Sequence, residues 1–269
     1  MPDPKDPTTP LARRAQPLGE VVEVIDVLPE LHDLLSGDRL EAARRGLRAR
    51  AVQVRRGRWA ATADTELVAG GLGFLVLEGA LMRCVTAAHR TSGELLGAGD
   101  LVRPNQDPCN TPPFSVFWRA ATQTRLAILD ERFTRAAAAV PELTGALIAN
   151  VTRRASTVGR QLVIAQSQSV EVRILSTLRD LSERWGVVTP EGLVLPEFLS
   201  HGTLALLLGA RRPSVTSAMV RLSARGALRR RDDGRWLLMA APEPEDNVRP
   251  LRPVPAATAV DGDEALGAV

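Results

Sequence analysis

The sequence predicts an α+β protein with an N-terminal β-roll of jelly-roll type, a long helix and a C-terminal winged helix-turn-helix. Three observations support this order. Short apolar segments separated by glycine-containing turns occupy residues 50–130, as in all-β units. A helical apolar pattern follows from Pro141. A helix–glycine–helix pattern and an arginine-rich hairpin then lie between residues 200 and 240.

The overall composition is that of a folded chain. Of 269 residues, 45% are apolar and 24% are charged, which excludes wholesale disorder. Aromatic residues make up 3% and tyrosine is absent, so we expect a core of Leu, Val, Ile and Ala. The net charge is +3, and Lys5 is the only lysine.

Several classes of protein are excluded by what the sequence lacks. Two cysteines, Cys84 and Cys109, are too few for a disulfide framework, and with three histidines they lack metal-site spacing. There is no apolar signal segment and no apolar run near the ~20 residues that cross a bilayer. We therefore expect a cytoplasmic protein without membrane contact. No catalytic triad, P-loop or dinucleotide motif is present, so we expect no enzyme and no cofactor.

Composition and periodicity set the expected domain boundaries. Residues 1–18 are rich in proline and predicted to be a disordered arm. We expect a β-roll sensor domain at 19–135, a dimerisation helix at 136–168 and the winged helix-turn-helix at 169–240. Residues 241–269 carry six acidic residues against two arginines, which predicts a disordered acidic tail.

The long helix is expected to begin at Pro141, because proline suits a first helical turn. Its apolar residues fall on one face, namely Leu143, Leu147, Val151, Val158, Leu162 and Ala165. A helix of roughly 25 residues is about 38 Å long, which exceeds what a small domain needs. We expect the stripe to pair with a second copy. The alternative is packing on its own β unit alone.

Residues 200–222 predict two short helices joined by a tight glycine turn. Ser200 is a good N-cap, and Gly209 falls where the chain must turn with positive φ. Pro213 suits the first turn of the second helix, and Val215 and Met219 give that helix a buried face. This is a helix-turn-helix.

The hairpin after the second helix forms a predicted wing. Asp233 and Gly234 are favoured in a two-residue turn. Residues 169–240 carry eleven arginines against seven acidic residues. Such a concentration of cations is typical of a surface that binds an anionic polymer. A solvated helical hairpin with surface charge is the alternative.

Such a second helix lies in the DNA major groove with its N-terminal residues on base edges. Arginine binds guanine O6 and N7 in bidentate fashion, and Ser and Thr reach bases or phosphates. The candidate DNA-binding residues are Arg211, Arg212, Ser214, Thr216, Ser217, Arg221, Arg230 and Arg235.

Segments 172–186, 204–215 and 234–238 resemble the winged helix of the Crp–Fnr transcription regulators. A β-roll similar to a cyclic-nucleotide-binding domain and a long dimer helix precede it in the same order. The resemblance implies a sequence-specific regulator that acts as a homodimer on a pseudo-palindromic operator. Its implied partners are double-stranded DNA, RNA polymerase and an unknown small-molecule effector. Arg212 matches the main base-reading arginine of the family, whereas Pro213 and Ser217 depart from its pattern and imply a different target sequence.

The resemblance also locates a phosphate cassette between residues 99–101 and 118–120. The Gly-Glu-Leu positions of cyclic-AMP-binding members here carry Arg103, Pro104 and Asn105, and the arginine position carries Phe114 before a matching Ser115. We therefore expect that cyclic AMP is not the effector. A regulator or effector module that binds its nucleotide through non-standard contacts is the alternative. The candidate ligand-binding residues are Arg103, Ser115 and Arg119.

Four further side chains are candidates for ligand binding or redox chemistry. Gly93, Glu94 and Leu95 form a Gly-Glu-Leu sequence like that of the cassette. They precede Gly99, however, so Glu94 is expected on the strand before the cassette. Cys84 with His89 could ligate haem, although the apolar pattern around Cys84 favours a small core residue. Cys109, in a polar loop, is a candidate redox thiol.

Overall fold

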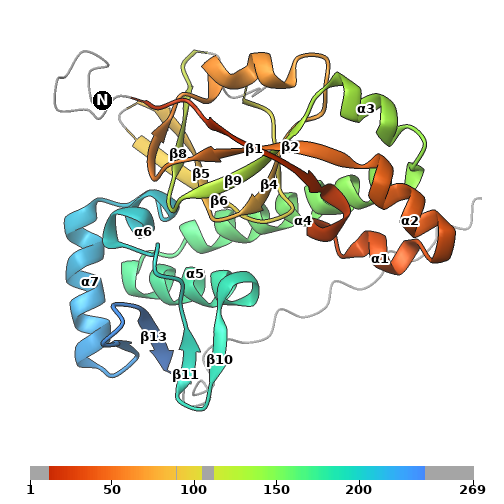
Figure 1. Cartoon of the computed structure of the whole chain (residues 1–269). Helices are drawn as coiled ribbons and strands as arrows, with labels where there is room; N and C mark the ends of the chain where they lie inside the picture. Colours follow the sequence, from red (N-terminus) through yellow and green to blue (C-terminus); the bar gives the residue numbers. More distant parts are fainter. Residues whose placement is uncertain (1–11, 89, 105–111, 240–269) are drawn as a thin grey trace, which may run out of the picture.

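The computed structural model describes residues 12–88, 90–104 and 112–239. Figure 1 shows the three predicted parts: a β-roll, the long helix α4 beneath it, and a smaller C-terminal domain that carries α5 to α7. The predicted α+β class is confirmed. No helix in the described ranges is long and apolar enough to cross a membrane.

Two antiparallel sheets form the β-roll. The five-stranded sheet has the order β1 (Gln16–Glu23), β2 (Arg48–Val54), β9 (Thr124–Leu129), β4 (Gly73–Glu78) and β7 (Leu101–Val102). The four-stranded sheet has the order β3 (Gly57–Trp59), β8 (Ser115–Ala120), β5 (Leu81–Ala87) and β6 (Arg90–Leu96).

The interior of the roll contains three of the nine aromatic residues of the chain. The ring centroid of Trp59 lies 5.5 Å from that of Phe74 and 6.1 Å from that of Trp118, both edge-on. These are favourable geometries for aromatic pairs. Valine, leucine, isoleucine and alanine side chains from β2, β4, β8 and β9 fill the remaining interior, as the composition predicts.

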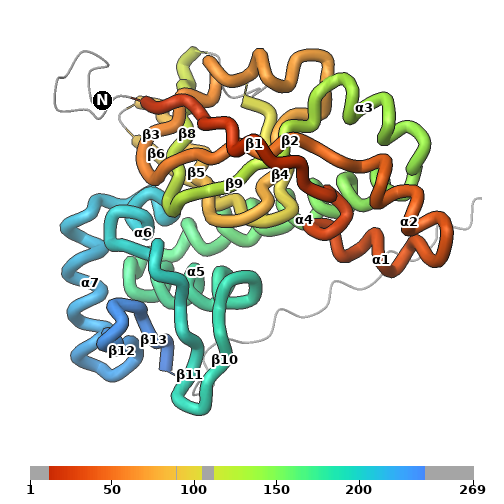
Figure 2. The backbone as a smooth tube through the Cα atoms, viewed as in Figure 1, coloured from red at the N-terminus to blue at the C-terminus, as the bar shows by residue number. Residues whose placement is uncertain are grey.

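The predicted boundary of the N-terminal arm is wrong. Strand β1 begins at Gln16 and pairs with β2 (Figure 2). The segment before it is fixed by Asp64, whose buried carboxylate accepts hydrogen bonds from Arg14 Nε at 2.8 Å and from the Ala15 backbone N–H at 2.7 Å. Buried carboxylates require such partners. Residues 1–11 lie outside the described residues.

Short helices pack against the β-roll. They are η1 (Val24–Val27), α1 (Glu30–Leu34), α2 (Gly37–Gly46), η2 (Ala61–Val68) and α3 (Glu131–Ala137). Asp130 caps α3 by accepting a 3.0 Å hydrogen bond from the Phe133 backbone N–H. Phe133 packs with Leu31, Leu47 and the start of α4 in one buried cluster.

Helix α4 runs from Pro141 to Ala165, as predicted, but its apolar residues form two faces rather than one. Leu143 and Leu147 are buried against the β-roll. Val151 and Leu162 are exposed, and Leu162 keeps 63% of its surface. Steps of three and four residues identify an apolar stripe on a helix. They do not distinguish a face that packs on the same chain from an adjacent face that stays exposed.

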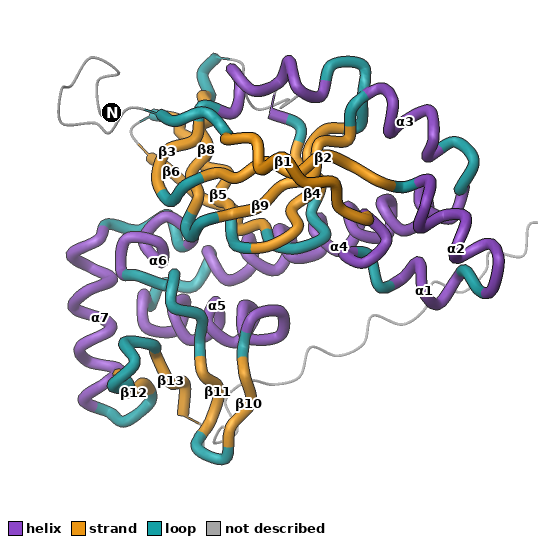
Figure 3. The backbone as a smooth tube through the Cα atoms, in the orientation of Figure 1, coloured by secondary structure: helices purple, strands orange, loops and turns teal. Residues whose placement is uncertain are grey.

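The C-terminal domain contains the predicted winged helix-turn-helix (Figure 3). Its elements are α5 (Val170–Trp185), β10 (Val187–Thr189), β11 (Gly192–Val194), α6 (His201–Leu207), α7 (Arg212–Ala224), β12 (Leu228–Arg230) and β13 (Trp236–Met239). The strands form one antiparallel sheet in the order β10-β11-β13-β12.

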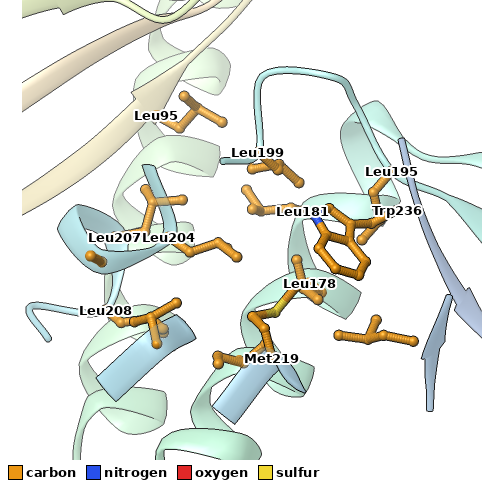
Figure 4. Close-up of a cluster of buried hydrophobic side chains, with 14 of the residues drawn as sticks. Leu95, Leu178, Leu181, Leu195, Leu199, Leu204, Leu207, Leu208, Met219 and Trp236 are labelled. Carbon is orange, nitrogen blue, oxygen red and sulfur yellow. The ribbon is translucent and has the colours of Figure 1, made fainter. Parts of the chain in front are cut away.

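The C-terminal domain shares a buried core with the β-roll. Met82 and Cys84 on β5 and Leu95 on β6 belong to the same apolar cluster as Leu204 and Leu207 on α6. Figure 4 shows Leu95 together with leucines of α5 and α6 and with Met219 of α7. The two parts that the sequence presents as successive modules are therefore packed against each other.

Candidate nucleic-acid interface

The turn between α6 and α7 has the geometry that the sequence predicts. The Ser200 hydroxyl accepts a 3.1 Å hydrogen bond from the Thr203 backbone N–H and so caps α6. Gly209 has a φ of +57°, which a residue with a side chain rarely adopts. The Ala210 backbone N–H then donates to the Ala205 carbonyl at 2.9 Å, and α7 begins two residues later.

Helix α7 is anchored on one side and free on the other. Val215, Ala218, Met219 and Leu222 are buried against the rest of the domain. Its first turn and outer face are exposed, and they carry Arg211, Arg212, Ser214 and Ser217. A helix N-terminus carries a partial positive charge that favours anions, and these arginines add to it.

The wing has a longer loop than predicted. The Arg231 backbone N–H donates to the Arg235 carbonyl at 2.9 Å, and the Gly234 N–H donates to the Arg231 carbonyl at 3.0 Å. The hairpin therefore has a three-residue loop, 232–234, rather than a two-residue turn. Gly234 has a φ of +78° and takes the left-handed position that such loops require.

Several arginines of this domain are engaged with acidic side chains. Arg221 Nε lies 2.5 Å from one carboxylate oxygen of Glu171, and Arg225 Nη1 lies 2.7 Å from the other. Arg229 pairs with Glu191. Arg221 is thus held against α5, which local sequence could not reveal because Glu171 is fifty residues away.

Four of the candidate arginines remain without a salt bridge within the described ranges: Arg211, Arg212, Arg230 and Arg235. The guanidinium of Arg230 lies over the Trp236 ring, 4.9 Å from its centroid. This stacking leaves the guanidinium edge free to donate hydrogen bonds. The uncompensated positive charge therefore concentrates at the first turn of α7 and on the wing.

His201 links α6, α7 and the wing, a role that the sequence did not reveal. Its Nδ1 lies 3.2 Å from Thr216 Oγ1, and its ring stacks on Trp236 with centroids 6.0 Å apart. Burial first, then the charges of Arg230 and Arg212, hold the pKa of His201 below its ordinary value. These surroundings favour the neutral ring, and the Thr216 hydroxyl is engaged with it.

A groove of about 600 Å³ lies where the β-roll meets this surface. We call it the interdomain groove. Thr122 of the roll lies on one side of it, and His201, Arg212 and Arg230 line the other. The first turn of α7 therefore adjoins the β-roll as well as solvent.

A second set of contacts, here called the interdomain clamp, joins α5 to the roll. It consists of Arg184, Asp100, Trp185 and Gly97. Arg184 Nη1 donates to Asp100 at 2.8 Å, and its Nη2 donates to the Ala98 carbonyl at 2.7 Å. The Trp185 ring packs so closely on Gly97 that a Cβ there would lie 2.9 Å from it. Asp100 is 2% exposed, so Arg184 supplies the charge that this buried carboxylate requires.

The candidate ligand residues are dispersed. Arg103 follows β7 and is exposed, with its Cγ close to Gly73. Ser115 and Arg119 lie on β8 and are exposed; Arg119 alternates with the buried Trp118, so it points away from the roll interior. No interaction within the described residues brings Arg103 to Ser115 or Arg119.

Two of the other polar candidates, Glu94 and Cys84, take part in an ion pair and in core packing, respectively. Glu94 lies on β6, as expected, and its carboxylate pairs with Arg154 of α4 at 2.7 Å. Burial raises the pKa of the Cys84 thiol to about 12, which makes it an unreactive core residue. His89, Asn105 and Cys109 lie outside the described residues. Among the described residues, no group of three His, Cys, Asp or Glu side chains could hold a metal ion.

No protein-family model matches this chain, and no curated protein matches it significantly. Solved structures do. A CooA mutant from Carboxydothermus hydrogenoformans aligns at 19% identity with a TM-score of 0.57, covering 78% of this chain and 90% of that one. A cyclic nucleotide-binding domain containing protein from Listeria monocytogenes aligns at 13% identity with a TM-score of 0.57, covering 80% and 97%. The c-di-GMP responsive global regulator CLP from Xanthomonas campestris aligns at 22% identity with a TM-score of 0.52, covering 72% and 95%.

The fold is thus that of a two-domain protein in which a β-roll and a winged helix are joined by a long helix. It is the fold of the Crp–Fnr transcription regulators, as the sequence resemblance implies.

The interdomain clamp generates a prediction for stability. Asp100→Asn and Arg184→Gln should each destabilise the chain, with a coupling free energy of about 1–2 kcal/mol in a double-mutant cycle. The value is modest because 35% of the Arg184 side chain is exposed and solvent screens the pair. Urea unfolding measures it.

Arg179→Gln is the matched control for this cycle, because Arg179 is exposed on the same helix. It should change the unfolding free energy by less than about 0.5 kcal/mol. A coupling energy near zero would show that the clamp does not hold the two parts together.

Proposed function

We propose that this protein is a sequence-specific DNA-binding transcription regulator of the Crp–Fnr type. The observation that carries the proposal is the first turn of α7, which is exposed and bears Arg211 and Arg212 without a salt bridge within the described ranges. A helix that projects its N-terminal cations from a winged domain fits the DNA major groove.

The contacts divide into two kinds. Arg211, Arg212, Ser214 and Ser217 occupy the turn that reaches base edges, where arginine reads guanine most effectively. Arg230 and Arg235 on the wing are placed to bind phosphates, which fix the register of the protein on DNA. The Thr216 hydroxyl contacts His201, so Thr216 is given a positioning role in place of a direct DNA contact. Arg221 is given a structural role, because Glu171 neutralises it.

The exposed face of α4 supports a homodimer. Ile148, Val151, Ala155, Val158 and Leu162 are exposed and spaced by three, four, three and four residues. This alternation keeps one seam of the helix facing a partner, as in a coiled coil. Two copies related by a two-fold axis would present two α7 helices about 34 Å apart to a pseudo-palindromic operator.

The β-roll is the proposed sensor, with an effector other than cyclic AMP. Two charged contacts of the cyclic-AMP cassette are missing from the sequence, and each such loss costs several kcal/mol in general (roughly 2–5). The dispersal of Arg103, Ser115 and Arg119 supports this proposal. The alternative, a nucleotide held through non-standard contacts, requires other side chains. RNA polymerase is a further proposed partner, and the cytoplasm the proposed location.

Replacing the main base-reading residue tests the proposal. Arg212→Ala should weaken binding to a selected DNA site by about 5- to 150-fold, the equivalent of about 1–3 kcal/mol, and relax specificity at one base position. Fluorescence anisotropy at fixed salt measures it. Arg179→Ala, which removes an arginine from the exposed face of α5, should leave affinity unchanged. Equal affinity of wild type and Arg212→Ala would contradict the assignment.

Dimerisation has its own test. Leu162→Glu places a charge in the proposed seam and should convert the dimer to a monomer in sedimentation analysis, since burying an unpaired charge is costly. Ser156→Glu adds the same charge to the same helix outside the seam and should leave the dimer intact. A dimer that survives Leu162→Glu with unchanged affinity would place the dimer interface elsewhere.

A further inference from the structure

A groove of about 740 Å³ lies on the β-roll, remote in sequence from α7 and the wing. The C-terminal end of α2, strands β2 and β9, and α3 surround it, and these elements lie beside one another in Figure 1. Its floor includes Ala49, Ile128 and Phe133, which are buried. Four exposed arginines line it: Arg45, Arg48, Arg50 and Arg132. We call this the basic groove.

The positive charge of the basic groove is largely uncompensated. Asp130 is the one acidic residue in its described lining. The Asp130 carboxylate already accepts the 3.0 Å hydrogen bond that caps α3, and it lies 3.4 Å from Arg50. Arg45, Arg48 and Arg132 have no ion pair within the described part of the chain.

Two other grooves among the described residues carry less net charge. The interdomain groove sets Arg56, Arg212 and Arg230 against Glu197 and Asp233. The groove between α4 and α5 is lined by four arginines and four acidic residues. The basic groove thus carries the largest net charge of the three. Neighbouring like charges repel, and a bound polyanion would relieve that repulsion.

The arrangement of the arginines in the basic groove suits the binding of carboxylates. Arg48 and Arg50 alternate along β2 with the buried Ala49 and Ala51, so both project from the same face of the sheet. Arg132 faces them from the first turn of α3. Guanidinium groups bind carboxylates with paired hydrogen bonds, and the apolar floor offers contact to a neighbouring aliphatic side chain.

The chain itself contains a segment of matching chemistry. Residues 261–264 read Asp-Gly-Asp-Glu, between Val260 and Leu266, and no basic residue follows Arg252. Asp261 lies 22 positions after Met239, the end of β13, a span of up to roughly 70–80 Å when extended. A folded chain of this length has a radius of gyration of about 18 Å, so this segment can reach any face of the molecule.

We propose that the acidic segment 261–264 docks in the basic groove, with its carboxylates on Arg48 and Arg132 and with Leu266 on the apolar floor. The arginines of α7 and the wing are the competing surface, but there the groove has two acidic residues of its own. Docking therefore leaves α7 free and covers a cationic surface of the β-roll.

A labelled peptide tests this docking. Its sequence is residues 256–269, and it is titrated by fluorescence anisotropy into the full chain carrying D261N, D263N and E264Q, which leaves the groove open. We expect saturable binding that weakens at least tenfold when R48Q and R132Q are added. The chain with its natural acidic segment should bind the peptide more weakly than the neutralised chain, because its own segment competes.

R211Q with R212Q, in the same neutralised chain, is the control and should leave peptide affinity unchanged. The proposal is overturned if the peptide does not bind, if R48Q and R132Q have no effect, or if R211Q and R212Q weaken binding as much. Arg45→Gln gives an independent test of the groove if the double variant does not fold, and it too should weaken binding.

Discussion

The outer face of β5 and β6 determines where the C-terminal domain can sit. Met82, Cys84 and Leu95 on this face are buried with Leu204 and Leu207 of α6. The approach is close: a Cβ at Gly93 of β6 would lie 3.4 Å from Leu206 Cβ of α6. Burying one such leucine contributes about 1.5–3 kcal/mol, which is at least comparable to the coupling free energy expected of the clamp.

This docking has consequences for the rest of the molecule. Since α5, α6 and α7 share one buried core with β5 and β6, α7 and the wing are held in place relative to the β-roll. The Arg184–Asp100 contact ties the C-terminal end of α5 to the β-roll, and the apolar seam residues of α4, such as Ile148 and Leu162, remain exposed. An effector could act only by binding one such arrangement better than another. The β-roll meets Arg212 at the interdomain groove, so a small displacement of the roll there would move the first turn of α7.

Local sequence signals predicted the local structure well. Ser200, Gly209 and Pro141 each act through their own backbone or the next turn, so the helix-turn-helix and the start of α4 could be placed. The period of α4 predicted its length but not that Leu147 and Leu162 face different partners. The wing loop differed because Gly234 serves a three-residue loop as well as a two-residue one.

What the sequence did not reveal rests on partners far apart in the chain. Asp64 fixes the segment before β1, Glu171 neutralises Arg221, and Asp100 holds Arg184 across 84 positions. No periodicity or turn signal connects such residues, and only the fold brings them together. The candidate DNA contacts therefore had to be divided by structure into free and engaged arginines.

We propose that two copies of this chain read DNA through paired α7 helices. Selection of binding sites from a random DNA pool, with the full chain at moderate salt, tests it most directly. The account predicts enriched sites with two-fold symmetry and half-site centres about 10 base pairs apart, one helical turn. Enrichment of single, asymmetric sites would contradict it.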